Sequence, residues 1–206
     1  MGNEADGRLA RGAARRNLLL DAATRVVAGS GSGSLTHRAV ATEAGVSIAS
    51  VTYHFASIGE LRRATLEHAG SSIGLDLAAL VMAASSRVDE TPEICAAFAV
   101  QLVTTRRVET AAVFELIVAA GHDEELRPTV ALFNGMLADL LAPYEGDRRS
   151  ALVVGAAIQG LLIAQLASAF PADAEELGIA VADLIRRYRK AEPISNRGSR
   201  TNSMHS

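Results

Sequence analysis

The chain has 206 residues, of which 49% are hydrophobic, 4% are aromatic and five are Pro, a composition that favours helices throughout. Its single cysteine, Cys95, excludes an internal disulfide framework and is typical of a reducing compartment. The net charge of −3 is unevenly spread: residues 1–56 carry six Arg and four acids, a net +2, and the other 150 residues sum to −5. A basic N-terminal part on an acidic body is the polarity that phosphate binding requires.

The chain begins with a polar segment, residues 1–14, that is rich in Gly, Ala and Arg and lacks helical periodicity. We expect a flexible basic arm here. A helix is predicted over residues 16–29, because Leu19, Ala22, Ala23 and Val26 fall along one face. The Gly/Ser run at residues 29–34 predicts a flexible loop after it.

Residues 35–61 contain two short helical patterns joined by a turn. Thr36 and Ser47 are suited to cap the two helices, and Gly45 supplies the backbone freedom that ends the first. The apolar residues recur at helical spacing, as Val40, Ala41 and Ala44 in the first helix and as Ile48, Val51 and Phe55 in the second. Two helices joined in this way form a helix-turn-helix, whose second helix lies in the DNA major groove.

Further helices are predicted along the rest of the chain. One starts near Ser57 and runs past Ala69 as a connector, through Leu66, Ile73, Leu77 and Leu80. The others are expected at residues 93–104, 108–120, 124–141, 148–169 and from 174 to 190, with breaks at 85–91, 143–147 and 170–173. We therefore expect an arm (1–14), a helix-turn-helix domain (15–69), a second helical domain (70–190) and a disordered polar tail (191–206).

Neither an enzyme nor a membrane protein is indicated. Residues 151–169 form the longest apolar run, but Gln159 and Gln165 interrupt it, and the N-terminus has no signal-peptide core. The cluster His122-Asp123-Glu124-Glu125 suits helix capping better than a metal site, and the apolar neighbours of Cys95 favour a buried, inert thiol. We expect no catalytic residues, no metal, no cofactor and a cytoplasmic location.

The helix-turn-helix carries a specific resemblance. Its residues resemble the N-terminal signature of the TetR family of bacterial transcriptional repressors, namely Leu35-Thr36, Arg38, Val40-Ala41, Ala44-Gly45-Val46-Ser47, Tyr53-His54-Phe55, Ser57 and Glu60-Leu61. The match covers residues 15–69, and the remainder is similar only to the all-helical plan of the family. The resemblance implies an all-α fold, with a three-helix N-terminal helix-turn-helix DNA-binding domain and a C-terminal helical ligand-binding and dimerisation domain. It also implies a homodimer that a small-molecule effector releases from double-stranded operator DNA.

The resemblance and the residue types together give a candidate DNA site. It comprises Thr36, His37, Arg38, Ser47, Ile48, Ala49, Ser50, Thr52, Tyr53 and His54. Arg38 suits the O6 and N7 atoms of guanine, although a phosphate contact stays open. Ile48 suits either a thymine methyl or the core, and the family implies phosphate contacts for Tyr53 and His54, with Phe55 in the core.

Two departures from the family pattern weaken the expected phosphate contacts. Thr52 stands where Tyr is common, and Ile58 stands where Lys is common, so one electrostatic anchor is missing. The candidates to replace it are Arg62, Arg63 and the arm's Arg8, Arg11, Arg15 and Arg16. The arm either follows the minor groove or is a solvated tail.

The second domain supplies the candidate ligand and dimer residues. The family plan and the larger side chains point to a ligand site of Phe98, Gln101, Phe114, Ile117, Phe133, Met136 and Gln159. Small apolar residues at helical spacing indicate a dimer interface of Gly155, Ala156, Gly160, Ile163, Ala167, Leu184 and Tyr188. We expect an apolar or amphipathic ligand without strong selection for cations, because acids are scarce on the apolar helix faces. The alternative is a dimeric DNA-binding regulator that is constitutive or corepressor-dependent.

Overall fold

The computed structural model describes residues 2–85, 87–168 and 173–189, and every regular element in these ranges is helical. The elements in chain order are α1 (Gly2–Ser30), η1 (Ser32–Ser34), α2 (His37–Ala44), α3 (Ile48–His54), α4 (Ile58–Ser85), η2 (Val88–Glu90), α5 (Thr91–Val103), α6 (Arg107–Ala119), η3 (Glu124–Leu126), α7 (Arg127–Glu145), α8 (Arg148–Ala167) and α9 (Ala174–Tyr188). The predicted all-α fold is confirmed, and the predicted tail at 191–206 lies outside the described residues.

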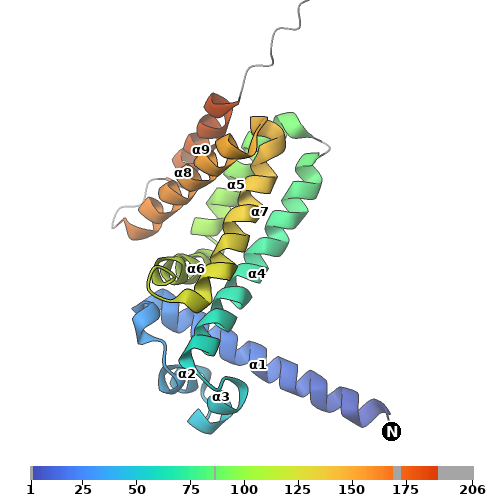
Figure 1. Ribbon diagram of the computed structural model, residues 1–206, viewed down its shortest axis with the longest axis vertical. Helices are drawn as coiled ribbons and strands as arrows, with labels where there is room; N and C mark the ends of the chain where they lie inside the picture. The colour runs from blue at the N-terminus through green and yellow to red at the C-terminus, as the bar shows by residue number, and fades with distance from the viewer. Residues whose placement is uncertain (1, 86, 169–172, 190–206) are drawn as a thin grey trace, which may run out of the picture.

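The first three helices and the beginning of α4 form a compact head at one end of the molecule (Figure 1). Its core consists of fully or almost fully buried apolar side chains, among them Leu19, Ala23, Val40, Val51, Phe55 and Leu61. Phe55 is completely buried, as predicted, and the Arg16 guanidinium carbon lies 5.0 Å from the centroid of its ring. This core holds α2 and α3 in a fixed mutual orientation.

The helix ends in the head follow from local chemistry. The Thr36 hydroxyl accepts a hydrogen bond from the Ala39 amide at 3.0 Å, and the Ser47 hydroxyl accepts one from the Ser50 amide at 3.2 Å. Gly45 has φ 65°, the left-handed conformation that ends a helix and favours glycine. The predicted caps and the predicted helix end are confirmed.

Helix α1 is longer than predicted. It begins at Gly2, so residues 2–14 are helical where the sequence had predicted an arm without helical structure. Ala, Arg and Leu favour a helix by themselves, whereas periodicity reveals only helices that bury a face. The side chains described near its end, Ala10, Arg11, Ala13 and Ala14, are exposed, and the segment extends away from the rest of the molecule (Figure 1).

Helix α7 also differs from its prediction. It continues to Glu145, through the predicted break at Pro143, and ends at Gly146 with φ 80°. Pro143 lies in the last turn, where it disrupts less of the hydrogen-bond ladder than it would in mid-helix. This extension places Glu145 inside the protein.

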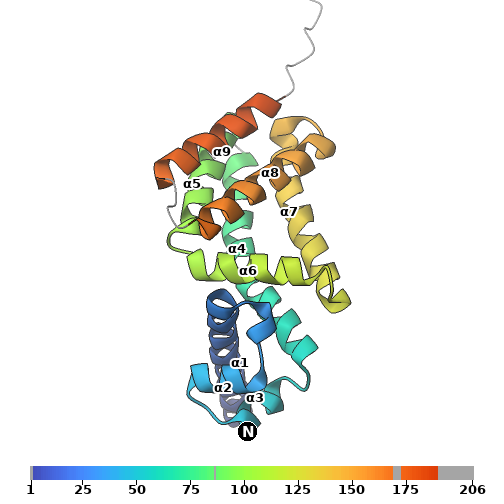
Figure 2. The same ribbon diagram turned by 90° about the vertical axis from the view of Figure 1, so that its left-hand side faces the viewer.

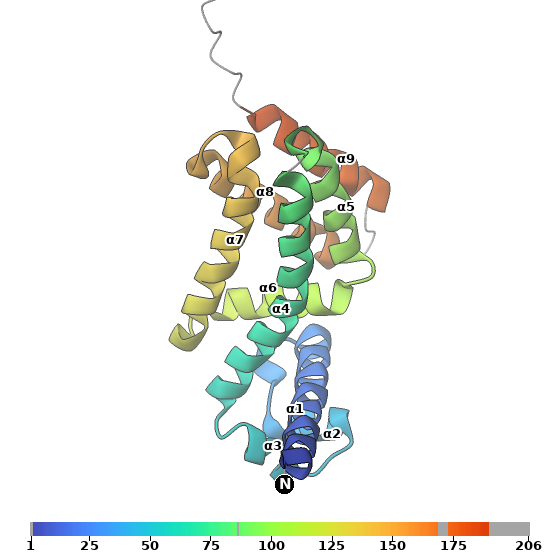
Figure 3. The ribbon, with the colours of Figure 1, turned by 90° about the vertical axis from the view of Figure 1, so that its right-hand side faces the viewer.

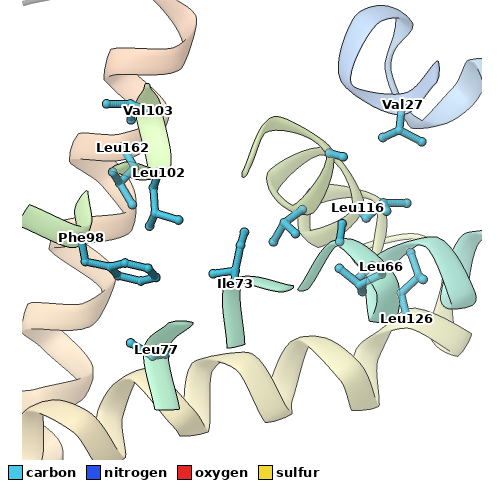
Figure 4. Close-up of a cluster of buried hydrophobic side chains, with 14 of the residues drawn as sticks. Val27, Leu66, Ile73, Leu77, Phe98, Leu102, Val103, Leu116, Leu126 and Leu162 are labelled. Atoms are coloured by element: carbon cyan, nitrogen blue, oxygen red, sulfur yellow. The ribbon is translucent and has the colours of Figure 1, made fainter. Parts of the chain in front are cut away.

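Helix α4 spans 28 residues and joins the head to the body formed by α5 to α9. Helix α6 lies across the junction and packs against both α1 and α4 (Figures 2 and 3). At this junction the fully buried side chains of Leu66, Leu116 and Leu126 lie close together, with Val27 of α1 beyond them (Figure 4). One hydrophobic cluster therefore runs from the head into the body.

Candidate nucleic-acid interface and ligand cavity

The residues predicted to bind DNA lie together at the far end of the head, on α2, α3 and their caps (Figure 1). Tyr53 is 85% exposed and Ile48 is 42% exposed, so the core alternative for Ile48 does not apply. The side chains of Arg38, Ala49 and Thr52 are exposed as well. Within the described residues Arg38 has no acidic partner, which leaves its guanidinium available to a ligand.

Besides the capping residues Thr36 and Ser47, two more of these ten residues use a polar side-chain atom for a contact within the head. A ring nitrogen of His37, Nε2, lies 2.9 Å from the Phe55 carbonyl oxygen and ties the start of α2 to the end of α3. The Thr52 hydroxyl lies 3.2 Å from the Ala49 carbonyl oxygen and donates to its own helix. Among the described residues, the exposed Tyr53 hydroxyl has no hydrogen-bond partner.

The arginines that could replace the missing phosphate anchor differ in whether their side chains are already paired. Arg62 lies 3.5 Å from Asp123, in the connection between α6 and α7, so its side chain is directed toward the body. Arg63 pairs with Glu67 at 3.2 Å on the surface of α4. Arg11 and Arg15 are exposed on the extended part of α1 and remain candidates for phosphate contacts.

The cluster at His122–Glu125 caps a helix. The Asp123 carboxylate accepts a hydrogen bond from the Glu125 amide at 3.1 Å and also faces Arg62. Among the residues that the structure describes, no group of three or more His, Cys, Asp or Glu side chains is arranged to hold a metal ion.

The body contains a partly open apolar cavity of about 100 Å³ between α4, α5, α6, α7 and α8. Its walls are Ile73, Leu77, Leu80, Cys95, Phe98, Ala99, Leu102, Thr110, Val113, Phe114, Ile117, Phe133, Leu137, Leu140, Ile158, Gln159 and Leu162. The Phe98 ring points toward Ile73 of α4, with Leu77 and Leu102 beside it (Figure 4). The Thr110 hydroxyl is buried and has no hydrogen-bond partner among the described residues, so it is a polar group that an occupant could satisfy.

Five of the seven predicted ligand residues line this cavity, namely Phe98, Phe114, Ile117, Phe133 and Gln159. Gln101 lies outside it, exposed in a shallow depression that it shares with Asp76, Phe98 and Arg106. Met136 lies against Gly74 of α4 rather than in the lining. The prediction missed the α4 wall, although the apolar spacing of Ile73, Leu77 and Leu80 was a usable signal.

Phe133 is seated directly on the backbone of α4. A β-carbon placed on Gly70 would lie 1.7 Å from Cζ of the Phe133 ring and 2.3 Å from Cε2. The ring tip therefore occupies the space that any other residue at position 70 would need. This contact forms the cavity wall where α4 leaves the head.

Two buried ionisable groups lie at the other end of the body. Burial, and then the charge of Glu145, raise the pKa of the Cys95 thiol to about 12, so the predicted inert thiol is supported. Glu145 is completely buried, and neither of its carboxylate oxygens has a hydrogen-bond partner among the described residues. Burial, and then Asp147, raise the pKa of Glu145 to about 7.

Helices α8 and α9 lie at one side of the molecule (Figure 2), and the large apolar side chains exposed on them are Leu152, Val153, Ile163, Ile179 and Tyr188. Of the predicted dimer residues, Ala156, Gly160, Ile163, Ala167 and Tyr188 are exposed on these helices, and Leu184 is half-buried. Gly155 is instead buried, and a β-carbon there would lie 3.1 Å from Leu137, so it packs inside the protomer. By length and composition alone, helix α8 could cross a membrane. A single helix of this kind is weak evidence for a membrane span, because core helices of other proteins meet the same criteria.

Comparisons with known proteins agree with this geometry. Residues 19–65 match the family model described as "Bacterial regulatory proteins, tetR family", and residues 86–187 match "Tetracyclin repressor-like, C-terminal domain". A TetR-family member from Streptomyces coelicolor A3 is 31% identical, with a TM-score of 0.71, over 82% of this chain and 97% of that chain. The multidrug binding protein EbrR in complex with ethidium is 31% identical, with a TM-score of 0.67, over the same shares. EbrR in complex with imidazole is 27% identical, with a TM-score of 0.67, over 87% of this chain and 97% of that chain. No protein of curated function matches the sequence significantly.

The contact between Phe133 and Gly70 gives a prediction about stability. Gly70→Ala should destabilise the protein by about 1–3 kcal/mol, because the new methyl group overlaps the ring. In a Phe133→Ala background the same substitution should stabilise, since Ala favours a helix over Gly by about 1 kcal/mol. Urea unfolding of the wild type, the two single variants and the double variant measures both effects on the free energy of unfolding.

Gly74→Ala is the matched control, because its β-carbon would lie 3.4 Å from the flexible end of Met136. If Gly70→Ala proves as stable as Gly74→Ala in the wild-type background, the ring does not rest on Gly70.

Proposed function

The chain belongs to the TetR family of bacterial regulatory proteins and is a transcriptional regulator, and from this premise we propose that it is a repressor released from operator DNA by a small molecule. The observation that carries the proposal is that α4 runs from the head into the wall of the cavity, and that α6, which forms another wall, packs against α1 of the head. A regulator of this kind requires such a connection, because an effector acts only through contacts that differ between the two states.

The proposed DNA surface is the exposed face of α2 and α3. Arg38 provides a planar donor for guanine, and Ile48 and Ala49 provide apolar contact for thymine methyls. Tyr53 and His54 are proposed to bind phosphates and to fix the orientation of α3 in the groove. The exposed arginines on α1 extend this surface along the DNA.

The proposed effector site is the cavity in the body. Its walls on α6 come from Thr110, Val113, Phe114 and Ile117. Another residue of α6, Glu115, accepts a hydrogen bond from the Ser32 amide at 3.3 Å, at the end of α1. An occupant that displaces α6 therefore acts on the head. The almost entirely apolar walls suit an apolar or amphipathic effector, and the binding of ethidium by the related EbrR supports an aromatic one.

The proposed assembly is a homodimer formed through α8 and α9. These helices expose large apolar side chains, which is unusual for a surface that faces water. The aliphatic ones are Leu152, Val153, Ile163 and Ile179. A two-fold four-helix interface covers them and sets the spacing of the two heads. We propose a cytoplasmic protein without catalytic activity, with a DNA-binding domain at 15–69 and a ligand-binding and dimerisation domain at 70–190.

A constitutive regulator is the alternative from the sequence. The apolar cavity, whose walls include α4 and α6, favours an effector-responsive protein over a constitutive one. A corepressor-dependent regulator would use the same cavity, but its ligand would strengthen DNA binding instead of weakening it.

The first prediction from this function concerns Arg38 and Tyr53. Arg38→Ala should weaken binding to the operator by about 1–3 kcal/mol and relax the preference at one base pair per half-site. Tyr53→Phe should weaken binding to all sequences about equally, because a phosphate contact carries no base information. Titrations on variants of an operator selected from a random DNA pool measure both. If Arg38→Ala loses affinity while its sequence preference stays intact, Arg38 contacts phosphate only.

The second prediction concerns assembly. Gly160→Glu should give monomers, because a two-fold interface places two new carboxylates at one apolar contact. Nothing in the protomer lies within 4 Å of a β-carbon at Gly160, so the substitution leaves the subunit itself intact. Light scattering at micromolar concentration measures the molecular mass. The control is Ala131→Glu, at an exposed position of α7, which should stay dimeric. A dimeric Gly160→Glu protein would move the interface elsewhere.

The third prediction concerns the effector. In a thermal-shift screen of apolar drugs, lipids and lactones, a cavity ligand present at 100 times its dissociation constant should stabilise the protein by about 2.7 kcal/mol. The same compound should lower the affinity for the operator. Two results together would refute the apolar site. None of these compounds would stabilise the protein, and a small polar metabolite without an apolar body would both stabilise it and release DNA.

A further inference from the structure

A depression of about 450 Å³ lies on the surface directly outside the cavity, between α4, α5 and the turn before α6. Its lining includes the polar residues Asp76, Gln101, Thr105 and Arg106. Leu80 and Phe98 line both the depression and the cavity, so these two side chains form the wall between the two spaces. Phe98 is 8% exposed, and its ring extends from α5 toward α4 (Figure 4). Displacing this ring would join the depression to the cavity.

The cavity alone is too small for a drug-sized effector. Its volume is about 100 Å³, whereas pockets for such ligands measure about 300–1,000 Å³. Two other depressions also share wall residues with the cavity, but their linings include Ala156 and Ile163 of the proposed dimer interface. The depression between α4 and α5 contains no residue of α8 or α9, so the proposed dimer leaves it open to water.

The polar lining of the depression indicates what an occupant would meet there. The Arg106 guanidinium donates hydrogen bonds to the Asp76 carboxylate and to the Ser72 hydroxyl, each at 2.6 Å, so the two charges of the lining neutralise one another. The side-chain amide of Gln101 is exposed and has no hydrogen-bond partner in the described part of the chain. The depression therefore suits an uncharged hydrogen-bonding group better than an ion.

We propose that the effector enters between α4 and α5 by displacing Phe98, and that it is an elongated amphipathic molecule with an uncharged polar end. Its apolar body lies in the cavity, and its polar end stays in the depression on the amide of Gln101. The proposal rests on the proposed effector site and identifies the entrance and the outer half of that site. Phe98 determines which molecules enter, because its ring closes the passage in the empty protein.

Cys95 reports on the entrance, because it is the single cysteine of the chain and lines the cavity. Its labelling by methyl methanethiolsulfonate, a small uncharged thiol reagent, is followed by mass spectrometry on the full-length protein without DNA. Ala79 is exposed and lines the depression, so Ala79→Trp should slow the labelling at least fivefold by covering the entrance. Ala78→Trp, at an exposed position of α4 outside the depression, is the matched control and should keep the wild-type rate. Equal rates for the two variants would overturn the proposed entrance.

A smaller side chain at position 98 tests the closing role of the ring. Phe98→Leu should speed the labelling of Cys95 at least fivefold, because the shorter side chain leaves the passage partly open. The free energy of unfolding, measured in urea for each protein, gives the labelling that occurs through global unfolding, and this part is subtracted. If the remaining rate equals that of the wild type, Phe98 does not close the passage.

The outer half of the site is tested with 1-octanol, which has an apolar chain and one uncharged hydroxyl group. It should protect Cys95 from labelling in the wild type. Gln101→Ala should raise the concentration for half-maximal protection at least threefold, because one hydrogen bond is lost. Thr104→Ala, at an exposed position outside the depression, is the control and should leave this concentration unchanged.

The bipartite site is overturned if 1-octanol does not protect Cys95, or if the two variants respond alike. A cavity ligand that still weakens operator binding after such a result would leave the proposed repressor function intact. The failure of this proposal is therefore distinguishable from the failure of the proposed function.

Discussion

The rest of the structure depends on α4, because this one helix runs through the hydrophobic cluster from the head into the wall of the cavity. Its first turn places Leu61 in the core of the head, Leu66 packs at the junction, and the later turns place Ile73 and Leu77 in the wall of the cavity. A continuous helix transmits displacement along its length, since its backbone hydrogen bonds resist bending. The orientation of the head is therefore fixed by the same side chains that enclose the cavity.

Apolar packing at the junction contributes more to this connection than its ion pairs do. The pair between Arg62 and Asp123 is partly exposed and 3.5 Å long, and such pairs are worth about 0–1 kcal/mol. Leu116 and Leu126 are completely buried at the same junction, and burying one Leu side chain is worth about 1.5–3 kcal/mol. Close-packed groups shift between discrete arrangements. An occupant of the cavity that repacks Phe133 on Gly70 thus acts directly on the backbone of α4.

The sequence predicted those features that depend on local chemistry. Thr36, Gly45 and Ser47 define the helix ends by their own side chains and backbone preferences, so the helix-turn-helix was predictable from a short window. The cavity was predicted in part, because helical phase shows which residues face inward but not which neighbouring helix they meet. The contact of the Phe133 ring with Gly70 joins residues that lie 63 positions apart in the sequence. The burial of Glu145 depends on the continuation of α7 through Pro143. Neither has a local signature, so neither could be predicted from the sequence.

The central claim is that the cavity and the DNA surface are coupled, and reciprocal linkage tests it most directly. The dissociation constant for the operator is measured with and without a saturating cavity ligand, and that of the ligand is measured with and without the operator. The account predicts that both constants rise by the same factor, between about 5 and 150. A ligand that binds in the cavity and leaves the affinity for the operator unchanged would contradict it.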